Sequence, residues 1–421
     1  MADEPRLPIL VTRLSYTDEV LDSIDLPEGT LTATRGLGSG LAHRAGDSPT
    51  RVWAVGDRGP NLKVPFAIEH YGARHLARYA DVDGAKIMPL LDIGPAISEL
   101  RIDADSVHHV RTFPLRDRSG KRLSGVPIPG GFNEPAFELD GTPISPDPSG
   151  ADTEGIAAAA DGTFWIADEY GPSVLHVAAD GTVLVRWVPE GSGHWFQGAD
   201  FPVVEALPAI AARRQLNRGF EGLALSEDET SLYLAFQSPL AHPDEHAHRQ
   251  ARHVRIWELN IATGAVVAEY LYPFDKPDSF RRDAELGDMH RRDLKVCELA
   301  ALGGNRLLVL ERGSATAKLY AVALDPARAI DPAWRDIATR PTIEELSGSD
   351  QIGGQVPHLA KTLLFSTDDH REVGADLEGI ALVSAETLLL VNDNDFGIED
   401  VPTTFWRIDF GSLPVENQRK V

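Results

Sequence analysis

The chain of 421 residues has a single cysteine, Cys297, so it cannot form an intrachain disulfide bond. Cys297 lies in an apolar run, Lys295 to Ala300, which predicts a buried and unreactive thiol. No run of about eighteen apolar residues occurs, so no transmembrane helix is predicted. Residues Met1 to Arg6 also lack the basic and apolar segments of a signal peptide. As written, the sequence predicts a cytoplasmic protein, or an extracellular or periplasmic one if a signal was removed.

Several familiar catalytic signatures are missing as well. There is no Gly-x-Ser-x-Gly motif, and no serine stands out as a nucleophile. The glycine-rich segment Gly36 to Gly40 is followed by neither a P-loop nor a dinucleotide fingerprint. The histidines His242, His246, His248 and His253 fall in a polar insertion, which predicts a solvated loop rather than a zinc site.

Basic residues are few relative to acidic ones: 40 Lys and Arg stand against 64 Asp and Glu, a formal charge of −24. Such a surface repels phosphate backbones and anionic lipids, so neither nucleic acid nor a membrane is an expected partner. The same surface attracts cations. An anionic substrate would need a metal ion or local arginines to overcome the repulsion. Separately, the protein is expected to be a monomer.

One sequence unit recurs along the chain. It reads Glu-Gly-Ile/Leu-Ala, then a turn, then an apolar strand that ends in polar residues. Clear copies begin at Asp152, Gly219, Cys297 and Asp376, and a degenerate copy begins at Gly38. Each copy predicts a β-hairpin, and antiparallel pairing places the start of one strand beside the end of the next. The acids of every copy are therefore expected on one common face.

The spacing between copies leaves room for two further strands in each unit. Four-stranded antiparallel units repeated around an axis predict an all-β fold, a β-propeller that forms one domain over residues 1–421. The long interval between the first two copies favours six blades, with five as the alternative. A strand near Ile9 to Val11 is expected to close the ring beside the last blade, which contains Phe405 to Ile408. Few helices are expected.

In a propeller the first strand of each blade lines the central channel, so the leading glutamates would converge at its mouth. Their repulsion would raise their pKa values unless a cation lay among them. Oxygen donors without histidine or cysteine favour Ca²⁺ over zinc or copper. The candidate ligands are Glu154, Glu221, Glu298, Glu378, Asn392 and Asp393. The alternative is that these acids cap strands or form salt bridges with Arg58 or Arg312.

Two arginines, Arg58 and Arg312, directly follow strand-end acids. Because a guanidinium binds phosphate or carboxylate oxygens in a bidentate manner, both are candidates to hold an anionic ester, unless they pair with the neighbouring acids. The candidate substrate-binding residues are Asp57, Arg58, Arg312, Lys361 and Asn394. The candidate catalytic residues are Asp168, Glu169, Arg58 and Arg312, with either acid orienting the attacking water.

Taken together, these motifs resemble the family named for the esterase-like activity of phytase, the phytase-like domain proteins. The matching segments are residues 55–60, 152–156, 166–171, 219–224, 236–240, 298–300, 310–312, 376–381 and 392–397. The resemblance covers roughly residues 30–410. It implies a relation to calcium-dependent β-propeller phytases, in which axial Ca²⁺ ions bind phosphate and activate water. It also implies export, since family members are usually exported.

The residues and the resemblance together predict a calcium-dependent hydrolase of phosphate monoesters or diesters, acting on a small anionic ester at the channel mouth. Two other classes stay open. One is a carboxylic-ester hydrolase or lactonase of the propeller type, which would also hold calcium in the channel. The other is a non-catalytic binding propeller that calcium merely stiffens.

Overall fold

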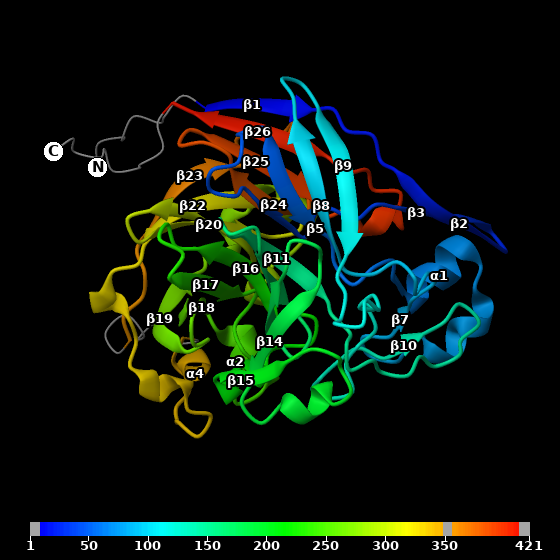
Figure 1. Ribbon diagram of the computed structural model, residues 1–421, viewed down its shortest axis with the longest axis horizontal. Coiled ribbons are helices and arrows are strands. Elements are labelled where there is room, and N and C mark those ends of the chain that lie inside the picture. The colour runs from blue at the N-terminus through cyan, green and yellow to red at the C-terminus, as the bar shows by residue number, and fades with distance from the viewer. Residues whose placement is uncertain (1–8, 348–355, 412–421) are drawn as a thin grey trace.

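The computed structural model describes residues 9–347 and 356–411. The first residues, on which the signal-peptide prediction rests, lie outside this part. The described chain is mostly β-strand with short helices, and most strands belong to antiparallel sheets of four or more strands (Figure 1). The prediction of an all-β fold built from four-stranded antiparallel units is confirmed at this level.

Five such sheets follow one another along the described chain. The first sheet contains β4 (Gly40–Ala42), β5 (Arg51–Val55), β8 (Ala96–Ile102) and β9 (Val107–Pro114). The second contains β11 (Thr153–Ala158), β12 (Phe164–Asp168), β13 (Ser173–Val177), β14 (Val183–Pro189) and a fifth strand, β15 (Val203–Leu207), which pairs parallel to β14. The third contains β16 (Phe220–Leu225), β17 (Ser231–Phe236), β18 (His253–Asn260) and β19 (Val266–Pro273). The fourth contains β20 (Lys295–Gly303), β21 (Arg306–Arg312), β22 (Ala317–Ala323) and β23 (Lys361–Ser366). The fifth contains β24 (Leu377–Leu382), β25 (Thr387–Asn392), β26 (Phe405–Phe410) and β1 (Ile9–Leu14).

The hairpin between β11 and β12 shows how the sequence forms these sheets locally. Gly162 has a φ of +96°, a conformation that costs glycine nothing because it lacks a Cβ atom. The backbone amide of Thr163 donates to the side chain of Asp161 at 2.9 Å. The pair Asp180-Gly181 repeats this arrangement between β13 and β14. The predicted turns therefore define where the strands reverse.

The first strands of the five sheets contact one another in a closed sequence: β4 touches β11, β11 touches β16, β16 touches β20, β20 touches β24, and β24 touches β4. Apolar clusters fill the space between neighbouring sheets. Trp53 and Phe164 pack between the first and second sheets, and Leu41 and Leu389 pack between the fifth and first. In the fifth sheet β1 pairs with β26, which confirms that an N-terminal strand joins the last hairpin.

The long interval between the first two copies holds, beside β8 and β9, an insertion that lies at the right of Figure 1. It contains α1 (Val64–Tyr71), η1 (Arg74–Tyr79) and the three-stranded sheet of β6 (Leu62–Lys63), β7 (Lys86–Ile87) and β10 (Ala136–Phe137). Strands β2 (Val20–Leu26) and β3 (Gly29–Thr34) form a separate hairpin. The other helices are α2 (Glu245–Gln250), α3 (Arg281–Leu286), α4 (Ile343–Ser347) and 3₁₀ turns at Gly193–Phe196, Ala209–Arg213, Pro277–Ser279, Arg291–Asp293, Pro326–Arg328, Pro332–Arg335 and Asp395–Gly397. Among the residues described, no helix has the length and apolar character needed to cross a bilayer.

A cavity of 930 Å³ lies between the five first strands, toward the ends where these strands finish. Apolar residues from each of these strands line it, among them Leu41, Ile156, Leu223, Leu299 and Ile380, and Glu227, Glu229 and Arg306 also contribute to its lining. The glutamates of the repeat stand at the beginnings of the same strands. The apolar cavity and the acidic mouth are therefore at opposite ends of the space that the first strands enclose.

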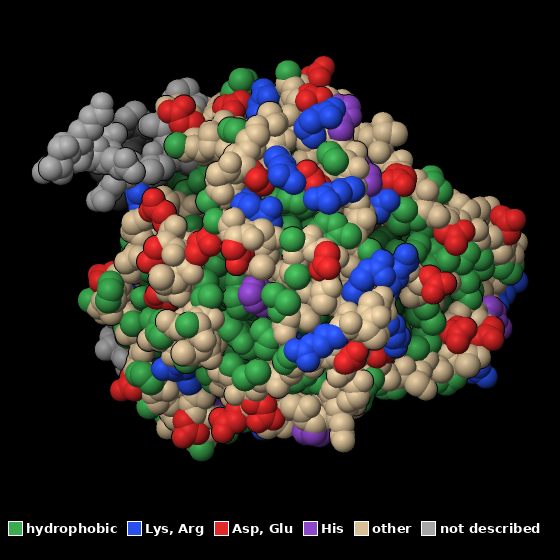
Figure 2. All heavy atoms as spheres, viewed as in Figure 1, with side chains coloured by type: hydrophobic (Ala, Val, Ile, Leu, Met, Phe, Trp, Pro, Cys, Tyr) green, Lys and Arg blue, Asp and Glu red, His purple; other side chains and the backbone are tan. Residues whose placement is uncertain are grey.

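The outer surface mixes charges despite the strong net negative charge. Figure 2 shows Lys and Arg side chains gathered over β5, β8 and β9, with acidic side chains among them. In this region Arg44, Arg51 and Arg111 lie against the Trp53 ring at 4.8, 4.7 and 5.9 Å from its centroid. The excess of acid is therefore not spread evenly over the molecule.

Candidate functional site

A β-bulge at the start of the first strand positions the glutamates of the repeat. In β11, β16 and β24 the pairing register slips by one residue next to Glu154, Glu221 and Glu378. A bulge turns the additional side chain out of the regular ladder. The three glutamates therefore occupy equivalent positions at the mouth, and none is more than 8% exposed.

Glu298 does not occupy this position, so the sequence alignment of the fourth copy was wrong by one residue. The slip in β20 falls at Cys297, and Glu298 pairs with Leu310 just as Gly379 pairs with Val391. Cys297 thus stands where the other copies have glutamate, and Glu298 stands where they have glycine. The fourth copy lacks that glycine. Aligning it with the other copies by its glutamate alone therefore shifted the alignment by one residue. The predicted burial of the Cys297 thiol is confirmed, with 0% exposed.

The Glu298 carboxylate lies inside the ring of first strands, next to the apolar cavity. Its Oε1 accepts hydrogen bonds from the backbone amides of Leu223 at 3.1 Å and Leu299 at 3.0 Å. Its Oε2 lies 3.1 Å from the place where a Cβ atom on Gly40 would be. Burial raises the pKa of Glu298 well above its usual value, and the backbone amides partly offset this effect. Glu298 therefore links β16 to β20, while its Oε2 is buried without a hydrogen-bond partner among the described atoms.

Glycines near the start of the first strands permit a close approach of neighbouring strands. A Cβ atom on Gly155 would lie only 2.1 Å from the carbonyl oxygen of Glu221, and one on Gly40 would lie 2.5 Å from that of Glu154. A larger residue would push the strands apart. These contacts bring the acids of successive sheets within range of one another.

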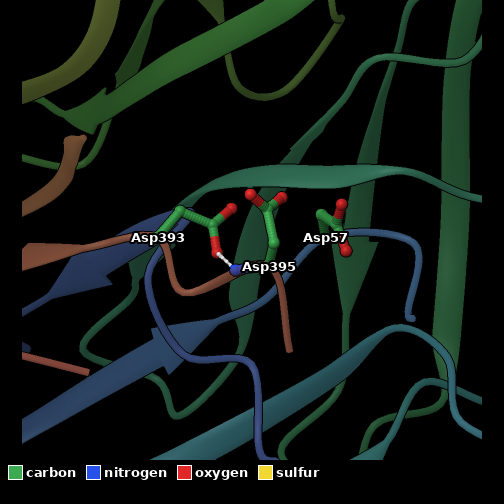
Figure 3. Close-up of side chains that lie close together, drawn as sticks. All are labelled: Asp57, Asp393 and Asp395. Atoms are coloured by element: carbon green, nitrogen blue, oxygen red, sulfur yellow. Dashed lines mark hydrogen bonds between the residues drawn. The ribbon is translucent and has the colours of Figure 1, made fainter. Parts of the chain in front are cut away.

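Asp57, Asp393 and Asp395 form the first acid triad, with one oxygen from each lying within 4.8 Å of the others. Asp57 follows β5, and the other two follow β25. The three carboxylates turn toward a common space, with that of Asp395 between the other two (Figure 3). The Asp395 amide donates to Asp393 Oδ1 at 3.0 Å, and the Gly59 amide donates to Asp57 Oδ1 at 2.9 Å. Burial and the charge of Asp152 raise the pKa of Asp57 to about 8.

Asp152, Glu154 and Glu169 form the second acid triad, also within 4.8 Å, and all three are buried. Burial, followed by the charge of Asp152, raises the pKa of Glu169 to about 7. Burial and then the charge of Glu221 raise the pKa of Glu154 well above its usual value. The Glu154 carboxylate forms no hydrogen bond or ion pair with any described residue. Asp152 pairs with Arg58, and Glu169 lies 3.5 Å from Arg214, so in this triad Glu154 is the acid without a positive partner among the described residues.

Glu221 lies beside the second triad and has an unused oxygen. Gln237 donates a hydrogen bond to its Oε1, while its Oε2 is buried and has no hydrogen-bond partner among the described atoms. The charge of Glu378 adds to burial in raising the pKa of Glu221. A cation at the mouth would satisfy this oxygen.

Arg58 forms ion pairs with acids of the protein, which is one of the two alternatives that the sequence left open for it. Its Nη2 forms an ion pair with Asp152 Oδ2 at 2.5 Å, and its Nη1 forms one with Glu134. Its backbone amide also donates to Asp152 Oδ1 at 3.1 Å. Arg58 thus fixes one member of the second triad and has little capacity left for a substrate.

Arg312 is paired in the same manner. Its Nη1 contacts Asp376 at 3.0 Å, its Nη2 forms an ion pair with Glu378, and its Nε lies 3.2 Å from the sulfur of Cys297. Because Glu378 forms this ion pair, it is not one of the mouth acids that lack a positive partner. Both arginines therefore organise the mouth from within.

Two other predicted residues lie outside both triads. Asp168 is completely buried and pairs with Arg186, and Ser173 donates a hydrogen bond to it. Lys361 binds Glu311 at 2.6 Å, in a polar cluster between the third and fourth sheets. These contacts stabilise the sheets, and the catalytic and substrate-binding roles assigned to the two residues stay predictions.

Two asparagines, Asn392 at the end of β25 and Asn394 just after it, bind backbone groups. The side-chain oxygen of Asn392 accepts from the amide of Thr404 at 2.6 Å, and its nitrogen donates to backbone carbonyls. Asn394 donates to Thr34 at 3.1 Å and accepts from the Phe396 amide at 3.2 Å. Their oxygens are therefore occupied by protein donors, and neither belongs to a triad.

The histidines of the insertion after β17 are not solvated as a group. His242, His248 and His253 are 3%, 4% and 6% exposed, and only His246 lies at the surface. The prediction of a solvated loop is wrong for these three, because the insertion forms α2, which packs against α4, and the rings of His248 and His253 bond to the Pro239 carbonyl and to Ser347.

Three residues that contribute to the mouth were not identified from the sequence: Asp152, Asp395 and Glu134. Asp152 carried a signal, because it precedes Glu154 by two residues as Asp376 precedes Glu378. Glu134 carried none, since it lies in an insertion outside every repeat and reaches Arg58 only through the fold.

One curated relative is an uncharacterized secreted protein of Arthroderma benhamiae. It is 27% identical over 238 residues, which are 50% of this chain and 44% of that protein. The chain therefore spans less than half the length of the relative.

Two solved structures illustrate the structural comparison. A calcium-binding protein, regucalcin, from Agrobacterium tumefaciens has a TM-score of 0.35 and 12% identity, over 96% of this chain and 98% of that one. A gluconolactonase from Xanthomonas campestris has a TM-score of 0.32 and 12% identity, over 97% and 99%. Scores this low carry no argument about activity.

The comparison with sequence families is more informative. The profile of the phytase-like family, described as esterase-like activity of phytase, matches residues 32–396, which include both triads, Glu221 and the two paired arginines. The chain belongs to the phytase-like family.

Proposed function

We propose that the five sheets are the blades of a five-bladed β-propeller and that the protein is a calcium-dependent hydrolase of phosphate esters. The closed sequence of contacts among β4, β11, β16, β20 and β24 supports five blades, the lower of the two counts expected from the sequence. The observation that carries the function is the pair of adjacent acid triads at the channel mouth.

The donor atoms fit a hard divalent cation. Both triads offer only carboxylate oxygens, which Ca²⁺ prefers and which zinc or copper sites seldom use alone. Glu221 Oε2 is buried without a hydrogen-bond partner, and the Glu154 carboxylate has no partner among the described residues. Positive charge between these acids would offset both the desolvation and the repulsion that raise their pKa values.

The chain's own residues would act as follows. Asp57, Asp393 and Asp395 would hold one ion, and Asp152, Glu154 and Glu169 a second, with Arg58 fixing the Asp152 carboxylate. When bound, Ca²⁺ supplies a Lewis acid that polarises a phosphoryl oxygen and lowers the pKa of a bound water. Glu169, at the edge of its triad near Arg214, is the candidate for orienting the attacking water.

Export from the cytoplasm is part of the proposal. Its support is the printed name of the curated relative, a secreted protein, together with the calcium requirement, because calcium is abundant outside cells. Immunodetection of the native protein in culture medium or periplasm, against the cell lysate, tests this point.

The test of the function is turnover of p-nitrophenyl phosphate monoesters and diesters in calcium and in EGTA. We expect hydrolysis that EGTA abolishes and calcium restores, and loss of turnover in Asp393→Asn. The exposed Glu69→Gln on α1 is the matched control. Turnover that persists in EGTA contradicts the calcium requirement, and turnover of lactones or aryl esters alone would favour a carboxylic-ester hydrolase instead.

Binding of calcium without turnover of any ester would favour the non-catalytic propeller. A rise in melting temperature on adding calcium, together with an inactive ester panel, would be that result.

A further inference from the structure

The channel mouth has a cationic side as well as an acidic one. Lys295 precedes Cys297 by two residues, so it occupies the place that Asp152 and Asp376 hold in other copies of the repeat. Arg218 lies just before β16, in the neighbouring third sheet. The fourth copy thus replaces acid and glutamate by lysine and cysteine, and the charge of the mouth reverses there.

These two cations have no salt-bridge partner in the described part of the chain. Neither side chain forms an ion pair or hydrogen bond with any residue in the described part of the chain, and the Nη1 atom of Arg218 is buried without a partner. In a protein with a net charge of −24, a basic side chain has many acids from which to find a partner. An unpaired pair of cations at this place therefore needs an explanation.

The strand pairing makes the arrangement costly in the absence of a ligand. Lys295 lies directly opposite Arg312 in the register of β20 and β21. Like charges directly opposite each other destabilise a sheet. The positive charge of Arg312 lowers the pKa of Lys295, with burial and Arg218 adding to the effect. Arg312 is neutralised by its ion pairs with Glu378 and Asp376, whereas Lys295 and Arg218 form no such pair with a described residue.

The site lies close to the second acid triad. The charges of Glu221 and Glu169 both act on Arg218, although burial and Arg312 dominate the lowering of its pKa. An anion held by Arg218 and Lys295 would therefore sit beside the carboxylates that we assign to a cation. A dianionic phosphoryl group matches this pattern, since two protein cations would face it from one side and a metal ion from the other.

We propose that Arg218 and Lys295 form the oxyanion site that holds the phosphoryl group of the substrate, in place of the ion-paired Arg58 and Arg312. This inference rests on the proposed function for the identity of its ligand. It specifies the substrate class as dianionic phosphate monoesters in preference to singly charged carboxylates or neutral esters.

The test measures binding of methylphosphonate, a phosphoryl probe that has no ester bond to hydrolyse, by calorimetry on the full chain with calcium present. We expect Arg218→Gln and Lys295→Gln each to weaken binding about ten- to hundredfold, the effect of removing a hydrogen bond to a charged group. Arg213→Gln, an exposed arginine just upstream, should leave binding unchanged. Acetate should bind more weakly than methylphosphonate to the wild type.

Calcium affinity and melting temperature separate this inference from loss of the fold. Both variants should keep calcium binding, and Lys295→Gln should melt no lower than the wild type without anion, because it removes a repulsion. Lys295→Arg, which keeps the charge, should bind methylphosphonate like the wild type. Wild-type protein that binds no methylphosphonate, or glutamine variants that bind it normally, would overturn the inference.

Turnover distinguishes the two proposals from each other. Ester hydrolysis with an unchanged KM in both glutamine variants would refute the oxyanion site and leave the hydrolase standing. An inactive ester panel with methylphosphonate binding that depends on Arg218 and Lys295 would retain the site and refute the hydrolase.

Discussion

The variant Glu154→Gln should be more stable than the wild type without calcium and less stable than the wild type with calcium. Glu154 is buried at the mouth, belongs to the second triad and has no positive partner among the described residues. Without a cation its charge opposes folding. With a cation the same charge becomes a ligand.

The magnitude follows from the geometry. Oxygens of Glu154, Asp152 and Glu169 lie within 4.8 Å of one another. Two unit charges at that distance repel by about 3 kcal/mol at an effective dielectric constant of about 20. Because these carboxyl groups can relieve the repulsion by binding a proton, we expect Glu154→Gln to stabilise the calcium-free protein by about 1 to 3 kcal/mol.

Calcium should stabilise the wild type more than the variant. Free calcium at about 100 times its dissociation constant stabilises a protein that binds it only when folded by about 2.7 kcal/mol. The variant has lost a ligand and should gain much less. In EGTA the variant should therefore be the more stable protein, and in calcium the wild type should be.

Urea unfolding in EGTA and in calcium, followed by circular dichroism, measures the four free energies of unfolding. Glu69→Gln, which removes an exposed charge on α1, is the control and should shift neither value appreciably. The reasoning is refuted if calcium stabilises wild type and Glu154→Gln equally, or if the variant is the less stable protein in EGTA.

Three further outcomes follow from the structure. Gly155→Ala would place a Cβ atom 2.1 Å from the carbonyl oxygen of Glu221 and should lower the free energy of unfolding by about 3 kcal/mol or more, as measured in urea. The control Gly287→Ala, whose Cβ atom would meet no described residue within 4 Å other than its chain neighbours, should change this free energy little. Burial lowers the pKa of His253 to about 4, so the unfolded chain binds this proton more readily than the folded protein does. The contribution of His253 to stability should therefore fall by roughly 2 kcal/mol from pH 7 to pH 5. The difference in stability between wild type and His253→Asn should change by this amount over that range, and a constant difference would contradict the prediction. The Cys297 thiol, with 0% exposed, should react with a thiol reagent only after unfolding, and rapid labelling of native protein would show that β20 opens.

The strands were predictable because their signals are local. Alternating apolar residues and Asp-Gly turns determine hairpins such as β11–β12 from a few neighbouring residues, and the pairing of β1 with β26 followed from counting strands in the last unit. The number of sheets was harder. The long interval after the first copy contains an insertion with its own small sheet, and length alone cannot distinguish such an insertion from a further unit.

The site was predicted less completely, and Glu298 shows why. The letters Glu-Leu-Ala suggest the repeat, but a one-residue bulge decides which side chain leaves the ladder, and it selects Cys297. The partners of Arg58 and Arg312 were equally hidden. Glu134 and Asp376 come from a distant loop and from the start of the next unit, and only the folded chain brings them to the arginines.

By itself, the sequence determined a β-rich repeat with an acid at the start of several of its first strands, because hydrophobic alternation and turn chemistry act between residues close together in the chain. Only the tertiary structure decided which acids meet without a counter-ion and which are neutralised by arginine, because that depends on contacts between sheets. The same contacts leave Arg218 and Lys295 without an ion pair near the acid triads. This separation of positive and negative charge arises from several copies of the repeat and is absent from any single copy.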